Sequence, residues 1–569
     1  MAIVQEAPLH HVDQAENYFD LCLRAAQEFL QTIVVVDDLA TYGKAEEITN
    51  LTMPLSGAAP DADEELEGID EAEPGSGSAL NVAALTDASA DLGLTCAVLR
   101  PRMEEQHDGT LDRRLTKAAQ RADVLVLDWQ LNDEPGGEAA LRLLSDVADD
   151  DQRRPARLRL VCIYTGEPDL GRVCEAVKNE LGSAVVRCSE TTETDIWLDC
   201  GCMRVVILSK AGGLGSLGED SPSVVSEDKL PERLLKEFTH LTAGLVSNVA
   251  VTALAAVRQD AHRLLTRFGK SLDPAFLSHR FFEGGAESEE LLVRLVADEI
   301  KSVLDGADIR RWTDPQAIRL WGQDNLPQST VFAAGKATRT LTKDSLLSVI
   351  DGETHYGSLR LADSAKPSES FDLAKVSKSS ITHLLVNDPE LAAELDYDFA
   401  RLTCLARNDA LPFPGKRSPI LTEGTILRGR IGQELIYVLC AMPLCDTVRI
   451  DSPRAFPFVP LKSVGPDNRY NLVALSPEGD RLYLAFSPKN HYDIVRHTFS
   501  GDVAGLVRSK RNRTPYGERF VFTASGGRPW IWIAELRFQH AHRKLHDIGA
   551  ASSRVGLDES HVLRMAGKD

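Results

Sequence analysis

Residues 123–128 read Asp-Val-Leu-Val-Leu-Asp, four consecutive apolar residues between two carboxylates. Short runs of Val, Ile and Leu without polar alternation are typical of parallel strands that are buried on both faces. Comparable runs occur at residues 32–38, 95–99, 159–165 and 204–210. Segments with helical periodicity separate them. We therefore predict an α/β fold, a doubly wound, flavodoxin-like sheet of five parallel strands with helices on both faces.

The helices expected around these strands define the first part of the chain. Helical patterns cover residues 13–31, 111–121, 137–147 and 170–181. We expect an N-terminal helix within residues 1–31 and an expanded α/β domain over residues 32–215. Residues 57–79 are acidic and rich in Gly, Ala, Pro and Ser, without the fixed alternating ligands of a calcium loop, and this composition predicts a disordered insertion.

Beyond residue 228 the sequence pattern changes. An apolar stripe at helical spacing extends from Leu234 to Phe268, and a further helix is expected at about residues 289–304. Shorter helical segments follow at 376–408, so we expect a helical region over residues 228–410. From there to residue 569 the pattern favours a small mixed β domain, closed by a helical tail from Glu535.

The composition limits the classes of function. The 569 residues include 85 acidic and 63 basic residues, for a net charge of −22, which disfavours binding to nucleic acid or to an anionic membrane. The one compact basic run, at residues 508–513, is interpreted as a solvated hairpin loop. Neither a secretory signal nor a membrane-spanning run is expected. The ten cysteines lie mostly in apolar patterns, which is typical of reduced thiols in a cytoplasmic protein; Cys200 and Cys202 lack a second pair for zinc.

Polar residues end the expected strands. Asp37 and Asp38 end the first, Asp128 the third, Thr165 the fourth and Lys210 the last. The carboxyl ends of parallel strands meet at one edge of the sheet, so these side chains are expected to lie together. Three carboxylates at one place favour a hard divalent cation such as Mg²⁺. One carboxylate could then accept a phosphoryl group as an acyl phosphate, with the ammonium and hydroxyl groups holding its oxygens.

The order of these residues resembles that of a response-regulator receiver domain over about residues 30–215. The resemblance implies that Asp128 is phosphorylated, that Thr165 is the switch hydroxyl and that Lys210 binds the phosphate. It also implies a magnesium site formed by Asp37, Asp38, Asp128 and the backbone carbonyl of Gln130. The chain departs from the family at Ala211, where a proline normally follows the lysine, and at Ile207, where an aromatic residue is common.

The whole chain is similar to large atypical receivers of phosphorelay-type bacterial anti-phage systems, such as the phosphate-buffer component of Detocs. This second resemblance implies a histidine kinase as phosphodonor and a second response regulator that carries the effector. We expect a chain that stores or drains phosphoryl groups and is not itself an enzyme.

Three alternatives remain open. The half from residue 220 could be a phosphorylation-gated adaptor, with the stripe from Leu234 to Phe268 as a homodimer helix as well as core. An aspartate-dependent phosphatase would commonly carry a second Asp two residues after the nucleophile, where this chain has Gln130. His262 lies on the expected long helix, and a surface or partly buried histidine is favoured over a phosphotransfer role.

Overall fold

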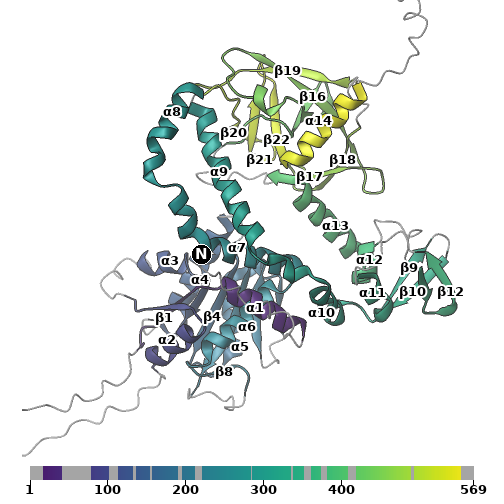
Figure 1. Ribbon diagram of the computed structural model, residues 1–569. Coiled ribbons are helices and arrows are strands. Elements are labelled where there is room, and N and C mark those ends of the chain that lie inside the picture. Colours follow the sequence, from purple (N-terminus) through teal and green to yellow (C-terminus); the bar gives the residue numbers. More distant parts are fainter. Residues whose placement is uncertain are drawn as a thin grey trace, which may run out of the picture. The chain divides into compact units, whose positions relative to one another are not determined.

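The computed structural model describes residues 17–40, 79–101, 113–131, 136–153, 157–189, 195–211, 221–283, 285–334, 337–350, 360–372, 381–407, 418–487 and 493–552. The predicted insertion 57–79 lies outside these residues except for Ala79, as do all residues before Asn17. The chain forms two compact units (Figure 1). The first contains residues up to Ala261 together with Val303–Asp324, and the second contains His262–Ser302 and Asn325–Asp569.

The first unit is built on an eight-stranded sheet. Its strand order is β2-β1-β3-β4-β7-β6-β5, with β8 paired to β7. The strands are β1 (Thr32–Val36), β2 (Thr95–Leu99), β3 (Val124–Leu127), β4 (Arg159–Thr165), β5 (Arg187–Cys188), β6 (Ile196–Cys200), β7 (Met203–Lys210) and β8 (Val224–Val225). The five strands from β2 to β7 along this order are parallel, as predicted. The prediction of an all-parallel, five-stranded sheet was wrong at one edge, where β6 and β5 add antiparallel strands.

Helices cover both faces of this sheet. One face packs on α1 (Tyr18–Phe29), α2 (Val82–Asp91), α6 (Leu230–Thr242) and α7 (Leu245–Arg267), with Ala317 of α10 (Pro315–Asn325). The other face packs on α3 (Arg113–Ala119), α4 (Glu138–Arg153) and α5 (Leu170–Leu181). Alternate residues of β3 belong to the two cores, because successive side chains on a strand point to opposite faces. The doubly wound arrangement is therefore observed.

Local signals explain where several helices begin and end. The side chain of Asn17 accepts a hydrogen bond from the backbone N–H of Asp20 at the start of α1, and Asp169 caps α5 in the same way through Arg172. The expected single stripe from Leu234 to Phe268 forms two helices, since the chain leaves helical geometry at Ala243, before Gly244. Leu234 and Phe238 are core residues, whereas Leu254 and Leu265 are exposed.

A fully buried ion pair fixes the opposite end of β4 from Thr165. The Arg159 guanidinium donates to both carboxylate oxygens of Asp151 on α4, at 2.6 and 3.0 Å, and also to the backbone carbonyl of Ala122. A buried ion pair is weak evidence for a net gain in stability. This one connects β4 to α4 through Asp151 and to the segment after α3 through Ala122.

Arg258 links α7 to this sheet. Its guanidinium donates to the carbonyl oxygen of Phe29 at 2.9 Å, lies 3.3 Å from a carboxylate oxygen of Asp123, and stacks 4.2 Å from the Phe29 ring centroid. We expect Arg258→Ala to lower the free energy of unfolding by about 1–2 kcal/mol, since hydrogen bonds to a charged group and a cation–π contact are lost. Chemical denaturation measures this change. Gln259→Ala, at an exposed neighbouring position, should change stability by less than about 0.5 kcal/mol; equal effects of the two variants would contradict this role.

The second unit begins with helices and two hairpins. Its first elements are α8 (Asp273–Glu283), α9 (Gly285–Gly306), β9 (Ser329–Ala334), β10 (Ala337–Thr342), α11 (Lys343–Ile350), β11 (Arg360–Asp363), β12 (Lys366–Asp372), α12 (Ile381–Val386) and α13 (Pro389–Cys404). Strand β9 pairs with β10 and β11 with β12, both antiparallel. These hairpins lie in a stretch where only helices were expected.

The rest of the second unit is one curled antiparallel sheet and a helix. The strands are β13 (Leu405–Arg407), β14 (Thr425–Ile431), β15 (Glu434–Cys440), β16 (Arg454–Val464), β17 (Leu472–Leu475), β18 (Arg481–Ala485), β19 (Val495–Phe499), β20 (Lys510–Thr514), β21 (Gly517–Thr523) and β22 (Pro529–Leu536), followed by α14 (Phe538–Ser552). One core contains Ala541 and Ile548 of α14, and a second, aromatic core contains Phe458, Phe499 and Trp530. The β-rich character and the helical tail agree with the prediction.

The strands of this sheet pair antiparallel. One detail differs from the prediction. The basic run does not form a loop: residues Lys510–Thr514 are the exposed edge strand β20, and the turn of the hairpin comes after them at Pro515 and Tyr516. Basic side chains on an edge strand discourage pairing with other chains, which explains why these residues are tolerated there.

Candidate functional site

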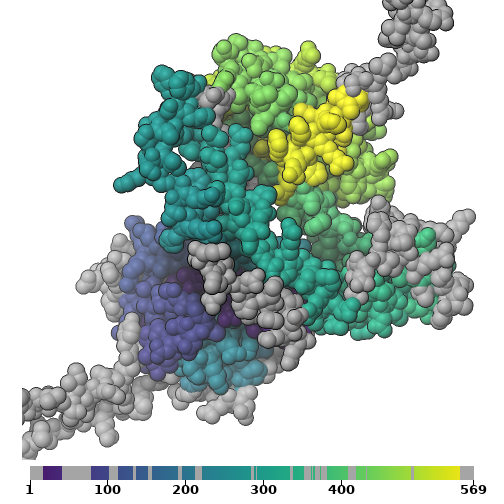
Figure 2. Space-filling model, in the orientation of Figure 1, coloured from purple at the N-terminus to yellow at the C-terminus, as the bar shows by residue number. Residues whose placement is uncertain are grey.

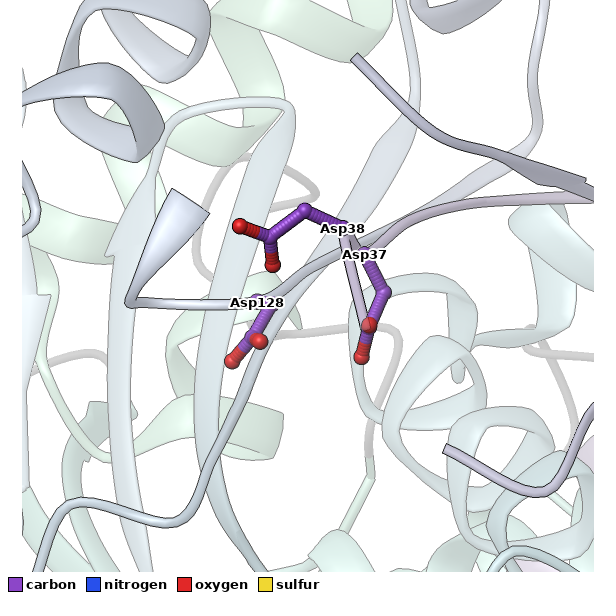
Figure 3. Close-up of side chains that lie close together, drawn as sticks. All are labelled: Asp37, Asp38 and Asp128. Atoms are coloured by element: carbon purple, nitrogen blue, oxygen red, sulfur yellow. The ribbon is translucent and has the colours of Figure 1, made fainter. Parts of the chain in front are cut away.

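Three carboxylates meet where β1 and β3 end. Oxygen atoms of Asp37, Asp38 and Asp128 lie within 4.8 Å of one another, and Figure 3 shows the three side chains gathered at the adjacent ends of these strands. Asp37 and Asp128 are buried, and Asp38 is half-buried. This is the only group of at least three metal-ligating side chains found among the described residues.

The strand pairing determines where these carboxylates lie. Asp128 continues the ladder beyond β3, because its backbone N–H donates to the carbonyl of Val36 at 2.9 Å. The N–H of Asp37 donates in turn to the carbonyl of Leu99 on β2. One Asp37 carboxylate oxygen accepts a hydrogen bond from the N–H of Leu39 at 2.8 Å, which orients the side chain. The acidic cluster is thus held by backbone geometry on rigid strands.

Lys210 joins the cluster from the end of β7. Its Nζ atom lies 2.8 Å from Asp37 Oδ2 and 3.3 Å from Asp128 Oδ2, and the side chain is buried. The residue reaches this position because β7 lies beside β4, which lies beside β3. A single ammonium group therefore contacts the carboxylates of two different strands.

Thr165 lies at the end of β4, between the strands of Asp128 and Lys210. It is fully buried, and the register of β3 and β4 pairs Leu127 with Ile163, which places Thr165 one step beyond the level of Asp128. Its hydroxyl oxygen accepts a hydrogen bond from the backbone N–H of Glu167 at 3.0 Å. The hydroxyl thus belongs to the same edge of the sheet as the carboxylates.

Gln130 lies two residues after Asp128 and is exposed. Its side-chain amide approaches a carboxylate oxygen of Glu167 at 3.5 Å, so Gln130 and Glu167 form the outer part of the site. Glu167 was not identified from the sequence, where it reads as an ordinary turn residue after Thr165. The assignment of the Gln130 carbonyl as a metal ligand stays a prediction.

Burial and neighbouring charges shift two pKa values in the cluster. Burial raises the pKa of Asp128 to about 6; the Lys210 ammonium opposes this rise, whereas the carboxylates of Asp37 and Asp38 add to it. For Lys210, burial favours the neutral amine, but the carboxylates of Asp128 and Asp37 outweigh that effect and raise its pKa. Lys210 is accordingly charged at neutral pH, and Asp128 carries a costly negative charge that a cation would stabilise.

A pH dependence of stability follows from the Asp128 carboxyl. Its pKa is raised on folding, so its contribution to stability is full below pH 3.8 and is lost as the pH rises through about 6. In the presence of a chelator, Asp128→Asn should therefore be more stable than the wild type at pH 8 by about 1–3 kcal/mol. This advantage should shrink at pH 4–5. Urea unfolding at the two pH values measures it, and an advantage that did not depend on pH would contradict this electrostatic account.

The edge of β7 that faces away from β4 is covered by two strands in succession. Strand β6 pairs with Met203–Ile207, and β8 then pairs with Ser209 and Lys210. The hydroxyl of Tyr164 donates to the carbonyl of Val225 at 2.6 Å, and the Tyr164 ring lies 5.8 Å from Lys210 Nζ. Strand β8 was not predicted, because a two-residue strand leaves little signal in a sequence. The contacts of Tyr164 were not predicted either, because they depend on where β8 lies.

The loop after Asp128 has its own close contact. Gly137 has φ +75°, and a Cβ atom there would lie 2.4 Å from the ring of the buried Trp129. Only glycine fits both the backbone conformation and the stacked indole. The residue after Asp128 is therefore packed in the core, against the backbone at Gly137.

Other candidates from the sequence do not join the site. His262 is an exposed residue on α7. All ten cysteines are free thiols, and Cys200 and Cys202 flank the turn between β6 and β7. Among the described residues, no helix is both long enough and apolar enough to cross a membrane.

Comparison with known families agrees with this arrangement. Residues 29–214 match the model of the response receiver domain, which is the class of domain that the parallel sheet and the acidic cluster define. The match covers strands β1 to β7 and the residues Asp37, Asp38, Asp128, Thr165 and Lys210, and it supports a phosphoacceptor role like that of response regulators. The comparisons with curated proteins and with solved structures gave no match.

Proposed function

We propose that Asp128 accepts a phosphoryl group from a partner histidine kinase and that the chain acts as a phosphate sink or signalling component of a phosphorelay. The observation that carries this proposal is the contact of Lys210 Nζ with carboxylates of both Asp37 and Asp128 in a buried cluster. This cluster ends a parallel sheet that matches the receiver family.

The chemistry assigns a role to each side chain. A carboxylate oxygen of Asp128 attacks the phosphorus of a phosphohistidine, the P–N bond breaks, and its electron pair stays on the imidazole nitrogen. The product is an acyl phosphate on Asp128. Lys210 is placed to neutralise charge on the phosphoryl oxygens, and Thr165 offers a hydroxyl donor at the same sheet edge. The chain contributes an acceptor and no turnover chemistry, so we infer that it is not an enzyme.

The donor set fits a magnesium ion. Asp37, Asp38 and Asp128 supply hard oxygen atoms, which Mg²⁺ prefers. Burial raises the pKa of Asp128, and the carboxylates of Asp37 and Asp38 add to this rise, so a bound cation would stabilise the ionised cluster. Bound Mg²⁺ would supply charge neutralisation for the phosphoryl oxygens. The backbone carbonyl of Gln130 is proposed as a further protein ligand beside these carboxylates.

The wider role rests on the rest of the chain. The resemblance of the whole sequence to large atypical receivers of anti-phage phosphorelays supports a place in such a relay, in the cytoplasm. A second response regulator with an effector would then compete for the same kinase. The covered edge of β7 agrees with a receiver that stores a phosphoryl group instead of signalling through that edge.

The chemical lability of the adduct tests the proposal. Incubation with Mg²⁺ and radiolabelled acetyl phosphate should give a covalent label that is stable in acid and lost in base, as expected for an acyl phosphate. A phosphohistidine would show the opposite lability. Omission of Mg²⁺ should reduce the label strongly. An acid-labile label, or no label with either acetyl phosphate or the cognate kinase, would refute the assignment.

A further inference from the structure

A helical arm in the second unit exposes large apolar side chains. We define the arm as residues 262–302, the end of α7, all of α8 and most of α9. Phe281 is 85% exposed, Phe282 78%, Leu265 68% and Leu277 59%. Figure 2 shows the side chains of the arm in teal. Exposed apolar surface of this kind is typical of sites at which proteins bind one another.

The exposed residues follow helical spacing. Leu277 and Phe281 are four residues apart on α8 and share one face, and the rings of Phe281 and Phe282 meet edge to face with centroids 5.5 Å apart. On α9, Val293 and Val296 are three residues apart and are also exposed. Both limbs of the arm therefore present an apolar helix face, the kind of surface that packs on another helix.

The two limbs carry opposite charges. The basic residues of the first limb, His262–Phe282, are Arg263, Arg267, Lys270 and Arg280, against the single acid Asp273. The second limb, 283–302, has the acids Glu283, Glu287, Glu289, Glu290, Asp298 and Glu299, against Arg294 and Lys301. Arg267 pairs with Glu299 within the arm, which shows that the charges of the limbs attract. The described and exposed residues Lys270 and Arg280 of the first limb and Glu289 and Asp298 of the second place opposite charges on separate limbs, which is complementary to the same surface of a second copy.

From these observations we propose that the arm binds the arm of a second copy of this chain. A two-fold axis would place the basic limb of one copy against the acidic limb of the other, and the same contact would be made twice. The apolar faces of α8 and α9 would then be buried between the copies. This proposal does not depend on phosphorylation of Asp128, and the experiments below are done without a phosphodonor.

Sedimentation equilibrium of the full chain tests the apolar contact. The wild type should form a dimer. The double variant Leu277→Ser with Phe281→Ser should raise the dissociation constant of this dimer by at least about 30-fold, because buried aromatic anchors dominate such interfaces. Val503→Ser is the matched control, since Val503 is exposed outside the arm. It should leave the dimer unchanged. Circular dichroism confirms that each variant is folded.

Charge exchange tests the identity of the partner. Lys270→Glu with Arg280→Glu should prevent dimerisation, and so should Glu289→Lys with Asp298→Lys. Mixing these two variants should restore a dimer that contains one of each, which only contact between opposite limbs explains. A wild type that stays monomeric at all concentrations, or a dimer that the arm variants leave intact, would overturn the proposal. A monomer whose arm amides are protected from hydrogen exchange would show that the chain covers its own arm.

Discussion

Replacement of Asp128 by asparagine is expected to abolish phosphorylation of the chain. Asparagine keeps the size of the side chain and an oxygen that can accept from Lys210, so the fold should persist. The amide oxygen is not a nucleophile toward phosphorus, so no acyl phosphate can form. The label transferred from acetyl phosphate or from the kinase, measured after denaturing electrophoresis, should fall to background.

The same strand supplies a matched control for this variant. Asp123 is also a buried carboxylate, but it precedes β3, whereas Asp128 follows it. It accepts hydrogen bonds from Gln31 and Thr32 at the opposite edge of the sheet from the cluster. Asp123→Asn should therefore keep its label. Full labelling of Asp128→Asn, or loss of label only in Asp123→Asn, would contradict the assignment of the acceptor.

Lys210→Met should slow phosphorylation by about 10²–10³-fold, the usual cost of removing one preorganised group that stabilises developing charge. The Lys210 ammonium lies against the carboxylates of both Asp37 and Asp128. It is therefore placed to stabilise the negative charge that develops on the phosphoryl oxygens. Initial rates of labelling with acetyl phosphate measure the effect. Lys236→Met, which removes a surface ammonium that pairs with Glu232, should leave the rate unchanged.

A second consequence of Lys210→Met separates a chemical role from a structural one. Lys210 lowers the pKa of Asp128, which is otherwise raised by burial and by Asp37 and Asp38. Without Lys210 the Asp128 carboxyl should ionise at higher pH, so the pH dependence of labelling should shift upward. A variant with merely lower stability would lose labelling without this shift. An unchanged rate and pH profile would show that Lys210 does not act on Asp128.

The parallel core could be predicted because its strands have a strong sequence signal. A strand buried on both faces needs a continuous apolar run, and a polar residue that ends such a run lies at the edge where the site forms. Asp37, Asp128 and Lys210 therefore lie together as expected, although no two of them are close in the sequence.

Features with weak local signals were missed. Strands β5 and β8 have two residues each, too few for an apolar pattern, and β9 to β12 contain polar residues inside an otherwise helical region. The break at Gly244 is hidden in a stripe whose spacing continues across it. Glu167 and Tyr164 gain their places at the site from tertiary contacts alone. These contacts depend on which strands become neighbours, which local propensity does not determine.

The most direct test of the account identifies the phosphorylated atom. Borohydride reduces an aspartyl phosphate to homoserine, and mass spectrometry of peptides from the phosphorylated, reduced chain locates that residue. We expect homoserine at position 128 alone, formed only when both Mg²⁺ and a phosphodonor were present. Homoserine at position 37 or 38, or an unmodified Asp128 in a chain that carries label on His262, would contradict the central claim.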